Sequence, residues 1–210
     1  MLDVLILGAG GFAREVFAWA RQHPECGARW RLAGFLDDNA DALNGYDLPV
    51  GIVGPLTGHV PQGNEVFLIG LGLPKAKIAC VPPLRERGAS FLRLVHPSVV
   101  LGQRVHLGQG VVVCPGAVLT SDVEVGDFAM INCNATVGHD AVVGAWSTLS
   151  GHVDITGYVK VGEGVFFGTR ASVIPGKQVG DGATVGAGAV VIRNVPEEAT
   201  VFGNPARVLG

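Results

Sequence analysis

A histidine and an aspartate stand side by side in the segment ATVGHDAVVG, whose other residues are small or apolar. Histidine gains and loses a proton near neutral pH, and a neighbouring carboxylate can fix its tautomer and stabilise its protonated form. His139 and Asp140 therefore predict a general base and its partner. Adjacent residues of a strand point to opposite faces, so the pair can interact only where the backbone bends. The alternative interpretation is a surface histidine without a role.

A glycine-rich turn near the N-terminus is typical of a phosphate site. The segment GAGGFA at residues 8–13 fits the pattern G-x-G-x-x-A, with Gly8 and Gly10 allowing a tight turn and close backbone approach. Asp37 and Asp38 end the next apolar segment, where a carboxylate can accept a hydrogen bond from a ribose or a base. About 90 residues form only half of a dinucleotide fold, so we expect one nucleotide rather than a nicotinamide cofactor. The alternative is a structural turn and a solvated acidic pair.

The segments around this turn alternate between strand and helix. Residues 1–10 predict a buried strand, and residues 11–24 place apolar side chains at helical spacing before Pro24. Residues 31–38 and 65–72 predict two further strands, separated by a polar, glycine-containing stretch, and residues 75–87 a short helix interrupted by Pro82 and Pro83. This order indicates a parallel sheet with crossover connections.

From Val95 onward an aliphatic residue or phenylalanine returns at every sixth position, seventeen times in succession. A helix repeats every 3.6 residues and a strand every two, so this period fits one short strand and one corner. We expect the repeated side chain to point inward and the glycine that often follows it to permit the turn. Three strands and three corners close a coil of 18 residues, and stacked coils share one core. The repeated positions are Val95, Leu101, Leu107, Val113, Leu119, Val125, Ile131, Val137, Val143, Leu149, Ile155, Val161, Phe167, Val173, Val179, Val185 and Val191.

The other histidines and the cysteines do not predict a metal site or a nucleophile. Ligands stacked on one face would be 18 residues apart, whereas His106, His139 and His152 are separated by 33 and 13 residues. No G-x-S-x-G elbow is present. The four cysteines form no C-x-x-C pair, and we expect them to be reduced thiols. No metal is therefore expected.

Composition excludes several classes of partner. The formal net charge is −3, which argues against a basic surface for nucleic acid. No apolar run reaches the roughly 18 residues of a membrane helix. The N-terminus begins with a strand-like segment rather than the charged start of a secretory signal. We expect a cytoplasmic protein without nucleic-acid or membrane partners.

The hexads, together with LGAGG and FLDD early in the chain, VGHDAVVG in the middle and VFGNPARVL near the end, resemble the hexapeptide-repeat sugar O- and N-acyltransferases. This family includes nucleotide-amino-sugar N-acetyltransferases and sialic acid O-acetyltransferases. The resemblance implies a Rossmann-like α/β domain over residues 1–92, followed by an all-β, left-handed parallel β-helix over residues 93–210. It also implies a homotrimer with active sites between neighbouring subunits.

The resemblance assigns roles to individual residues. His139 and Asp140 match the catalytic base and its acidic partner, and Asn132 matches an asparagine that faces the same cleft. The nucleotide sugar is expected at the glycine turn, and acetyl-CoA along a groove of small residues in later coils. The nucleotide-sugar positions are Gly8, Gly10, Gly11, Asp37, Asp38 and Gly70, and the acetyl-CoA positions are Gly157, Gly168, Thr169, Gly186, Ala187 and Gly188.

The implied reaction is acetyl transfer from acetyl-CoA to the amine of a UDP- or GDP-linked 4-amino sugar, for bacterial surface glycans. The amine attacks directly in a ternary complex, with the backbone N–H of Gly157 as candidate oxyanion donor. Two alternatives stay open: O-acetylation of a sialic acid or related sugar, and a noncatalytic prism that binds a sugar nucleotide. Phe12, Leu71 and Thr148 depart from relatives, which carry polar residues or a histidine there.

Overall fold

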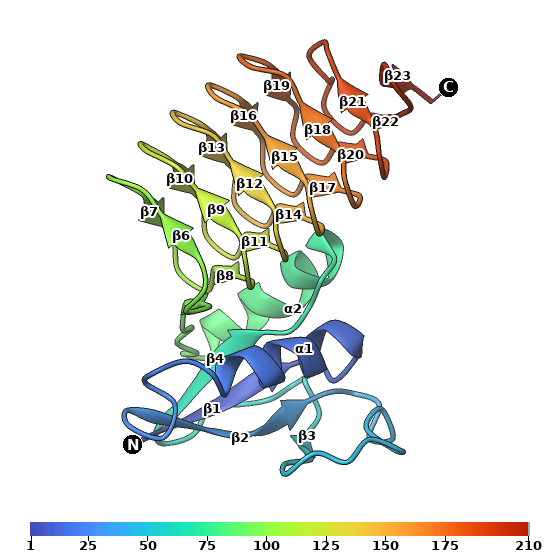
Figure 1. Cartoon of the computed structure of the whole chain (residues 1–210). Helices are drawn as coiled ribbons and strands as arrows, with labels where there is room; N and C mark the ends of the chain where they lie inside the picture. The colour runs from blue at the N-terminus through green and yellow to red at the C-terminus, as the bar shows by residue number, and fades with distance from the viewer. Residues whose placement is uncertain (210) are drawn as a thin grey trace. The chain divides into compact units, whose positions relative to one another are not determined.

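The computed structural model describes residues 1–209 and divides the chain into two compact units, Met1–Pro97 and Ser98–Gly210. The domain boundary expected after residue 92 lies inside the first of these units. The first unit contains helices and a sheet, whereas the second consists of short strands joined by corners (Figure 1).

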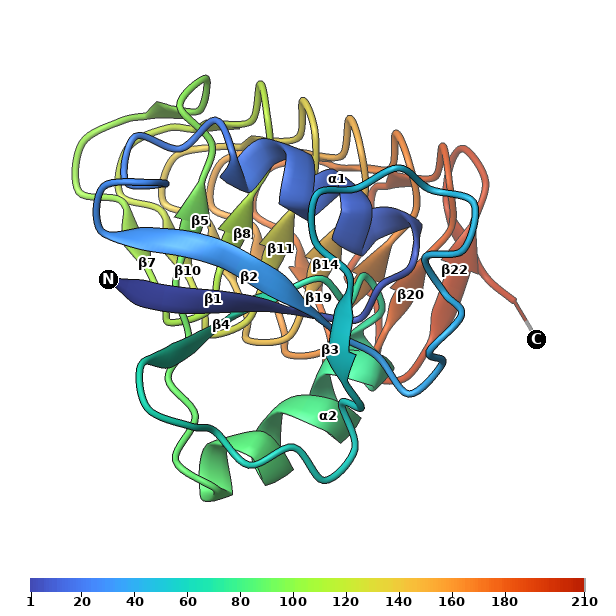
Figure 2. The ribbon, with the colours of Figure 1, turned by 90° about the horizontal axis from the view of Figure 1, so that it is seen from below.

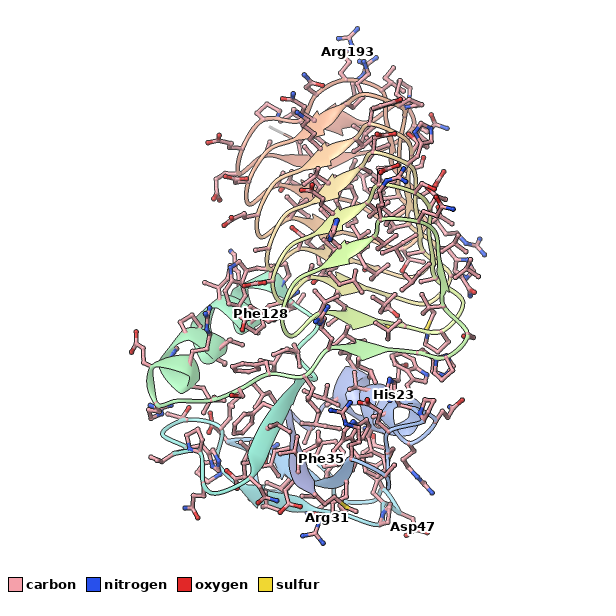
Figure 3. All side chains as sticks on the ribbon, turned by 90° about the vertical axis from the view of Figure 1, so that its left-hand side faces the viewer. His23, Arg31, Phe35, Asp47, Phe128 and Arg193 are labelled. Atoms are coloured by element: carbon pink, nitrogen blue, oxygen red, sulfur yellow. The ribbon has the colours of Figure 1, made fainter. Side chains whose placement is uncertain are left out.

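The N-terminal unit is built on a parallel sheet with the strand order β3-β2-β1-β4, in which β1 lies between β2 and β4 (Figure 2). Apolar side chains of β1, β2 and β4 form its core, and Phe35 is fully buried there (Figure 3). The strand order reverses between β1 and β4, and parallel sheets bind ligands beyond the carboxyl ends of the strands at such a reversal. The elements are β1 (Leu2–Leu7), α1 (Gly11–Ala20), β2 (Trp30–Leu36), β3 (Ile52–Gly54), β4 (Glu65–Ile69), α2 (Pro74–Glu86) and β5 (Leu94–Val95).

The edge strand β3 lies in the stretch that the sequence predicted as a polar connection. It pairs in parallel with the end of β2, Ile52 beside Phe35 and Gly54 beside Leu36. Three residues are too few to display an alternation of apolar and polar side chains, so periodicity could not reveal this strand.

The helix α2 continues through Pro82 and Pro83, where the sequence predicted an interruption. Neither proline can donate a hydrogen bond to the carbonyl four residues earlier. Buried Val81 and Leu84 nevertheless hold this part of the helix in the core. Within residues 1–209, no helix combines the length and the apolar sequence needed to cross a bilayer.

The C-terminal unit winds as a parallel β-helix of mostly two-residue strands (Figure 1). Paired strands of successive coils lie 18 residues apart, as Val100 beside Val118 and Val118 beside Thr136, which confirms the predicted coil length. The strands of this unit form three faces, each named here after its first strand within the unit. The β6 face contains β6 (Val100–Leu101), β9 (Val118–Leu119), β12 (Thr136–Val137), β15 (Asp154–Ile155), β18 (Ser172–Val173) and β21 (Val190–Val191). The β7 face contains β7 (His106–Leu107), β10 (Glu124–Val125), β13 (Val142–Val143), β16 (Lys160–Val161) and β19 (Gln178–Val179). The β8 face contains β8 (Val112–Val113), β11 (Met130–Ile131), β14 (Thr148–Leu149), β17 (Phe166–Phe167), β20 (Thr184–Val185), β22 (Thr200–Phe202) and the antiparallel β23 (Arg207–Val208).

The repeated aliphatic positions form the interior of the β-helix, as predicted. Each repeated position from Val113 to Val191 is buried. Leu101 is 44% exposed, because it lies on the first strand of the β6 face, with no earlier coil stacked on that face. At the opposite end of the unit, Arg193 projects outward (Figure 3).

The glycines that follow the inward residues were expected to permit the turns, and that expectation is wrong. Positive φ values occur two residues after these glycines, for example at Asp140 (φ +57°) after Gly138 and at Arg170 (φ +60°) after Gly168. A Cβ on Gly138 would instead lie 2.6 Å from the backbone nitrogen of Gly157 in the next coil. Close stacking of the coils, rather than backbone conformation, therefore requires glycine at these positions.

Candidate active site

The corner between the β6 and β7 faces, named here the His139 corner, brings His139 and Asp140 together. Nδ1 of His139 lies 2.8 Å from Oδ2 of Asp140. The positive φ of Asp140 supplies the bend that two consecutive side chains need in order to meet, and aspartate tolerates this conformation better than most residues. With the carboxylate accepting the Nδ1 proton, Nε2 carries the lone pair of the neutral imidazole. The two side chains are 57% and 43% exposed, so Nε2 can receive a proton from a bound molecule.

The next coil supplies the surroundings of Nε2. A Cβ on Gly157 would lie 2.7 Å from Nε2 of His139, so glycine is needed for the imidazole to approach this backbone. The ring of Tyr158 stands edge-on to the imidazole, with the two centroids 4.9 Å apart and an interplanar angle of 90°. The backbone N–H of Tyr158 donates to the carbonyl of His139 over 2.9 Å. The imidazole is thus held between Asp140 and Tyr158, with Nε2 facing Gly157.

The earlier coils place a charge pair on the same corner. The guanidinium of Arg104 donates to both carboxylate oxygens of Asp122, over 2.7 Å for the Nη2–Oδ2 contact. This pair holds the pKa of Asp122 below its usual value and raises the pKa of Arg104, which Asp140 raises a little further. Asp122 and Asp140 are one coil apart, roughly 4.8 Å along the axis. Arg104 thus places a positive charge on the same corner as these two carboxylates.

The remaining residues predicted for the β-helix site lie on another edge of the prism. Asn132 follows β11 at the corner between the β8 and β6 faces, named here the Asn132 corner, and its Oδ1 accepts the N–H of Cys133 over 2.7 Å. A Cβ on Gly168 would lie 2.5 Å from the nitrogen of Ala187, so these small residues also serve coil stacking. The structure therefore brings Gly157 to His139 but keeps the other predicted acetyl-CoA positions away from it within one chain. The residues on the Asn132 corner are Asn132, Gly168, Thr169, Gly186, Ala187 and Gly188.

The glycine turn lies at the strand reversal of the N-terminal unit. Gly8 has a φ of +84°, and Gly10 precedes α1 with no side chain capping the helix and no acidic residue in its first turn. Such a helix start offers backbone N–H groups and a partial positive charge to an anion. A Cβ on Gly70 would lie 2.6 Å from the carbonyl oxygen of Leu7, so glycine at the end of β4 allows close packing beside β1.

The two predicted acidic residues hold the chain around this turn. Oδ2 of Asp37 accepts the N–H of Ala9 over 2.7 Å, and its Oδ1 accepts the N–H of Asn39 over 2.8 Å. Asp38 accepts the N–H of Thr57 over 2.8 Å and the Thr57 hydroxyl over 2.6 Å, which lowers the pKa of Asp38. Asp37 therefore connects the glycine turn with the segment after β2, and Asp38 fixes the segment after β3.

Sequence reasoning missed Tyr158, although a signal was available. Tyr158 lies 18 residues after Asp140, so the coil length places the two residues on one corner. An aromatic side chain on the corner of the candidate base was therefore detectable by counting. Across residues 1–209, no three His, Cys, Asp or Glu side chains are grouped so that they could hold a metal ion.

Comparison with known protein families gives two matches within the chain. A model of the PglD N-terminal domain matches residues 3–81, and a model of the hexapeptide repeat of succinyl-transferase matches residues 158–193. The putative acetyltransferase YvoF of Bacillus subtilis is 43% identical over 25% of this chain and 31% of its own length. The serine acetyltransferase of Salmonella typhimurium is 30% identical over 58% of this chain and 39% of its own length. The chain thus spans between 31% and 39% of the length of these curated relatives.

Solved structures match the chain from end to end. The acetyltransferase domain of PglB from Neisseria gonorrhoeae has a TM-score of 0.90 and 27% identity, covering 100% of both chains. The structure of PerB from Caulobacter crescentus, in complex with CoA and GDP-perosamine, has a TM-score of 0.88 and 34% identity, covering 99% of this chain and 97% of that chain. These matches define the fold class as a Rossmann-like α/β unit followed by a left-handed parallel β-helix of hexapeptide repeats. The chain belongs to the hexapeptide-repeat sugar acyltransferases, the family that its sequence resembles.

Proposed function

We propose that the protein transfers an acetyl group from acetyl-CoA to the amine of a nucleotide-linked amino sugar, with a UDP- or GDP-4-amino sugar as acceptor. The observation that carries the proposal is the exposed imidazole of His139, held by Asp140 and facing the backbone of Gly157. The 34% identity to PerB, whose structure holds CoA and GDP-perosamine, supports the choice of both substrates.

In the proposed reaction His139 acts as the general base. The amine of the sugar attacks the carbonyl carbon of the thioester, and Nε2 of His139 takes the proton that the amine loses. Asp140 stabilises the resulting imidazolium through Nδ1. The carbon–sulfur bond then breaks, and the imidazolium returns the proton to the departing CoA thiolate. No covalent acyl-enzyme is formed, because both substrates are held together in one complex.

The backbone N–H of Gly157 is the proposed donor to the oxyanion. No residue within 1–209 accepts a hydrogen bond from this N–H, and it lies beside the ring nitrogen that acts as base. A donor fixed in a coil needs no rearrangement when negative charge develops on the carbonyl oxygen.

The proposed active site requires more than one copy of the chain. His139 and Asn132 lie on different corners of one prism, and so do Gly157 and Thr169. We expect a homotrimer in which the His139 corner of one copy faces the Asn132 corner of its neighbour. The small residues of the Asn132 corner would then line one side of the pantetheine arm of acetyl-CoA, opposite the base.

The nucleotide is proposed to bind at the glycine turn of the N-terminal unit. The uncapped start of α1 offers N–H groups to the diphosphate. Asp38 already accepts two hydrogen bonds, and a carboxylate has about four acceptor positions, so it can also accept one from a base or ribose.

A panel of acceptors tests this function. The protein is incubated with acetyl-CoA and UDP-, GDP- and CMP-linked amino and hydroxy sugars, and CoA release is followed. We expect turnover with a UDP- or GDP-linked amino sugar. Turnover confined to sialic acids would replace N-acetylation by O-acetylation. Absence of both turnover and CoA binding would contradict the enzymatic proposal and favour a noncatalytic prism.

A further inference from the structure

Arg14 lies one turn into α1, and its guanidinium is directed back toward the start of the helix. Its Nη2 lies 3.8 Å from the position that a Cβ on Gly11 would occupy. Its Cζ lies 3.5 Å from the centroid of the Tyr46 ring, so the guanidinium stacks on that ring. The glycine turn, the helix start and an arginine are therefore neighbours within the N-terminal unit.

The positive charge of Arg14 is not balanced by a carboxylate within residues 1–209. Arg29, Arg31 and Arg104 each form an ion pair with an acidic side chain, whereas the Arg14 side chain forms neither an ion pair nor a hydrogen bond with any of the described residues 1–209. Its Nε is buried without a hydrogen-bond partner. A cation near a helix N-terminus is unfavourable, because the helix dipole is positive there. The start of α1 and the guanidinium of Arg14 are thus two adjacent positive groups without a carboxylate to balance them in the described part of the chain. Such an arrangement is typical of a site for an anion.

Tyr46 fixes the orientation of this guanidinium. Stacking on the ring covers one face and leaves the Nη edge available for hydrogen bonds. The loop that carries Tyr46 is itself ordered by local bonds: Asn39 donates to Asp37, Asp41 to Asn39, and Tyr46 to the carbonyl of Leu43. Asp37 also accepts the N–H of Ala9 in the glycine turn. One carboxylate therefore holds both the glycine turn and the loop that carries Tyr46.

We propose that Arg14, held in place by Tyr46, binds the diphosphate of the sugar nucleotide. This inference rests on the proposed function and adds a specificity-determining residue to its nucleotide site. The two Nη groups of a planar guanidinium match two phosphate oxygens, and such charged hydrogen bonds are among the strongest in proteins. Arg14 would therefore distinguish a nucleoside diphosphate from a nucleoside, while other groups recognise the base.

Isothermal titration of the full chain with UDP, GDP, uridine and guanosine tests the proposal. We expect wild type to bind at least one diphosphate, and Arg14→Gln to bind it about 10- to 100-fold more weakly, without a matching loss for the nucleoside. Tyr46→Leu should weaken diphosphate binding about 2- to 10-fold, and Tyr46→Phe, which keeps the ring, should stay near wild type. The matched control is Arg21→Gln at the other end of α1, where Cζ lies 6.0 Å from the Phe17 ring. Acetyl-CoA affinity should not change in any of these variants.

The outcomes distinguish failure of the proposed nucleotide site from failure of the proposed role of Arg14. If wild type binds neither UDP nor GDP, the proposed nucleotide site fails, and the role of Arg14 fails with it. If wild type binds a diphosphate and Arg14→Gln binds it equally well, the role of Arg14 is overturned while the nucleotide site stands. An equal loss for diphosphate and nucleoside would also overturn it, because the side chain would then act on the base or on the loop. Thermal unfolding of each variant shows whether it is folded.

Discussion

The two units use acidic residues in different ways. At the strand ends of the N-terminal unit, Asp37 and Asp38 accept hydrogen bonds from the backbone of their own chain. At the His139 corner, Asp140 directs an oxygen to an imidazole that is more than half exposed. The first arrangement holds loops in place, and the second leaves a proton acceptor open to a substrate. Substitution of Asp37 or Asp38 should therefore affect stability first, and substitution of His139 or Asp140 should affect turnover first.

The largest effect is expected from His139→Ala. Loss of a general base lowers turnover by about 10²- to 10⁴-fold, because the amine must then lose its proton to water. Acetyl-CoA binding and thermal unfolding should remain close to wild type, since the imidazole is exposed. His106→Ala, on the outer side of β7, is the matched control and should keep full turnover. Comparable turnover in both variants would remove His139 from its proposed role.

Two glycines on different corners allow effects on the base to be separated from effects on coil stacking. In Gly157→Ala the new Cβ meets the His139 ring at 2.7 Å, which displaces the base and lowers turnover by about 10²-fold. In Gly126→Ala, at the corner between the β7 and β8 faces, the Cβ meets the backbone nitrogen of Ala145 at 2.5 Å, so the coils must separate and thermal stability should fall. Turnover and unfolding temperature are measured for both. A stability loss in Gly157→Ala as large as that in Gly126→Ala would contradict this division.

Lys77 gives the N-terminal unit a pH-dependent stability. Burial in α2 lowers the pKa of this amine from its ordinary value to about 7. Between pH 7 and 10 the unfolded chain holds a proton on Lys77 that the folded chain lacks, so stability rises with pH. The contribution is about 1.4 kcal/mol per pH unit in that range. Denaturant unfolding of wild type and Lys77→Met checks it, and equal pH slopes for the two proteins would refute it.

The smallest effect is expected from Asp37→Ala. The N–H groups of Ala9 and Asn39 lose their acceptor, which lowers the free energy of unfolding by about 1–3 kcal/mol. Asp37→Asn retains an acceptor oxygen and serves as the control, with a smaller loss. Denaturant titration measures both. If Asp37→Ala unfolds like wild type but no longer binds UDP or GDP, Asp37 belongs to the substrate site rather than to the scaffold.

Counting by 18 would have predicted much of the β-helix site. His139 and Gly157 differ by 18, as do Gly168 and Gly186, whereas His139 and Asn132 differ by 7, which places them on different corners. Such arithmetic also locates Tyr158. Counting could not show why glycine is required at the corners. A close contact with the next coil and a turn both appear in the sequence as a repeated glycine. Stacking and turning both select glycine.

The N-terminal unit was predictable as an order of strands and helices but not in its details. No period links Asp37 to Ala9 or Arg14 to Tyr46, since each contact joins segments whose separation along the chain is unrelated to any repeat. The continuation of α2 through two prolines depends on burial rather than on local preference. Local patterns therefore predicted where a ligand would bind, and only the folded chain showed which side chains already hold hydrogen bonds within the unit.

The constant coil length has a consequence for how this chain can change in length. Inserting or deleting one whole coil of 18 residues beyond Gly157 leaves every later residue on its own corner and moves it by roughly 4.8 Å along the axis. Inserting a single residue instead shifts all later side chains out of register with the coils beneath them. The length of the β-helix beyond Gly157 can therefore change only by whole coils. The length of prism surface available to an acyl donor changes in the same steps of roughly 4.8 Å.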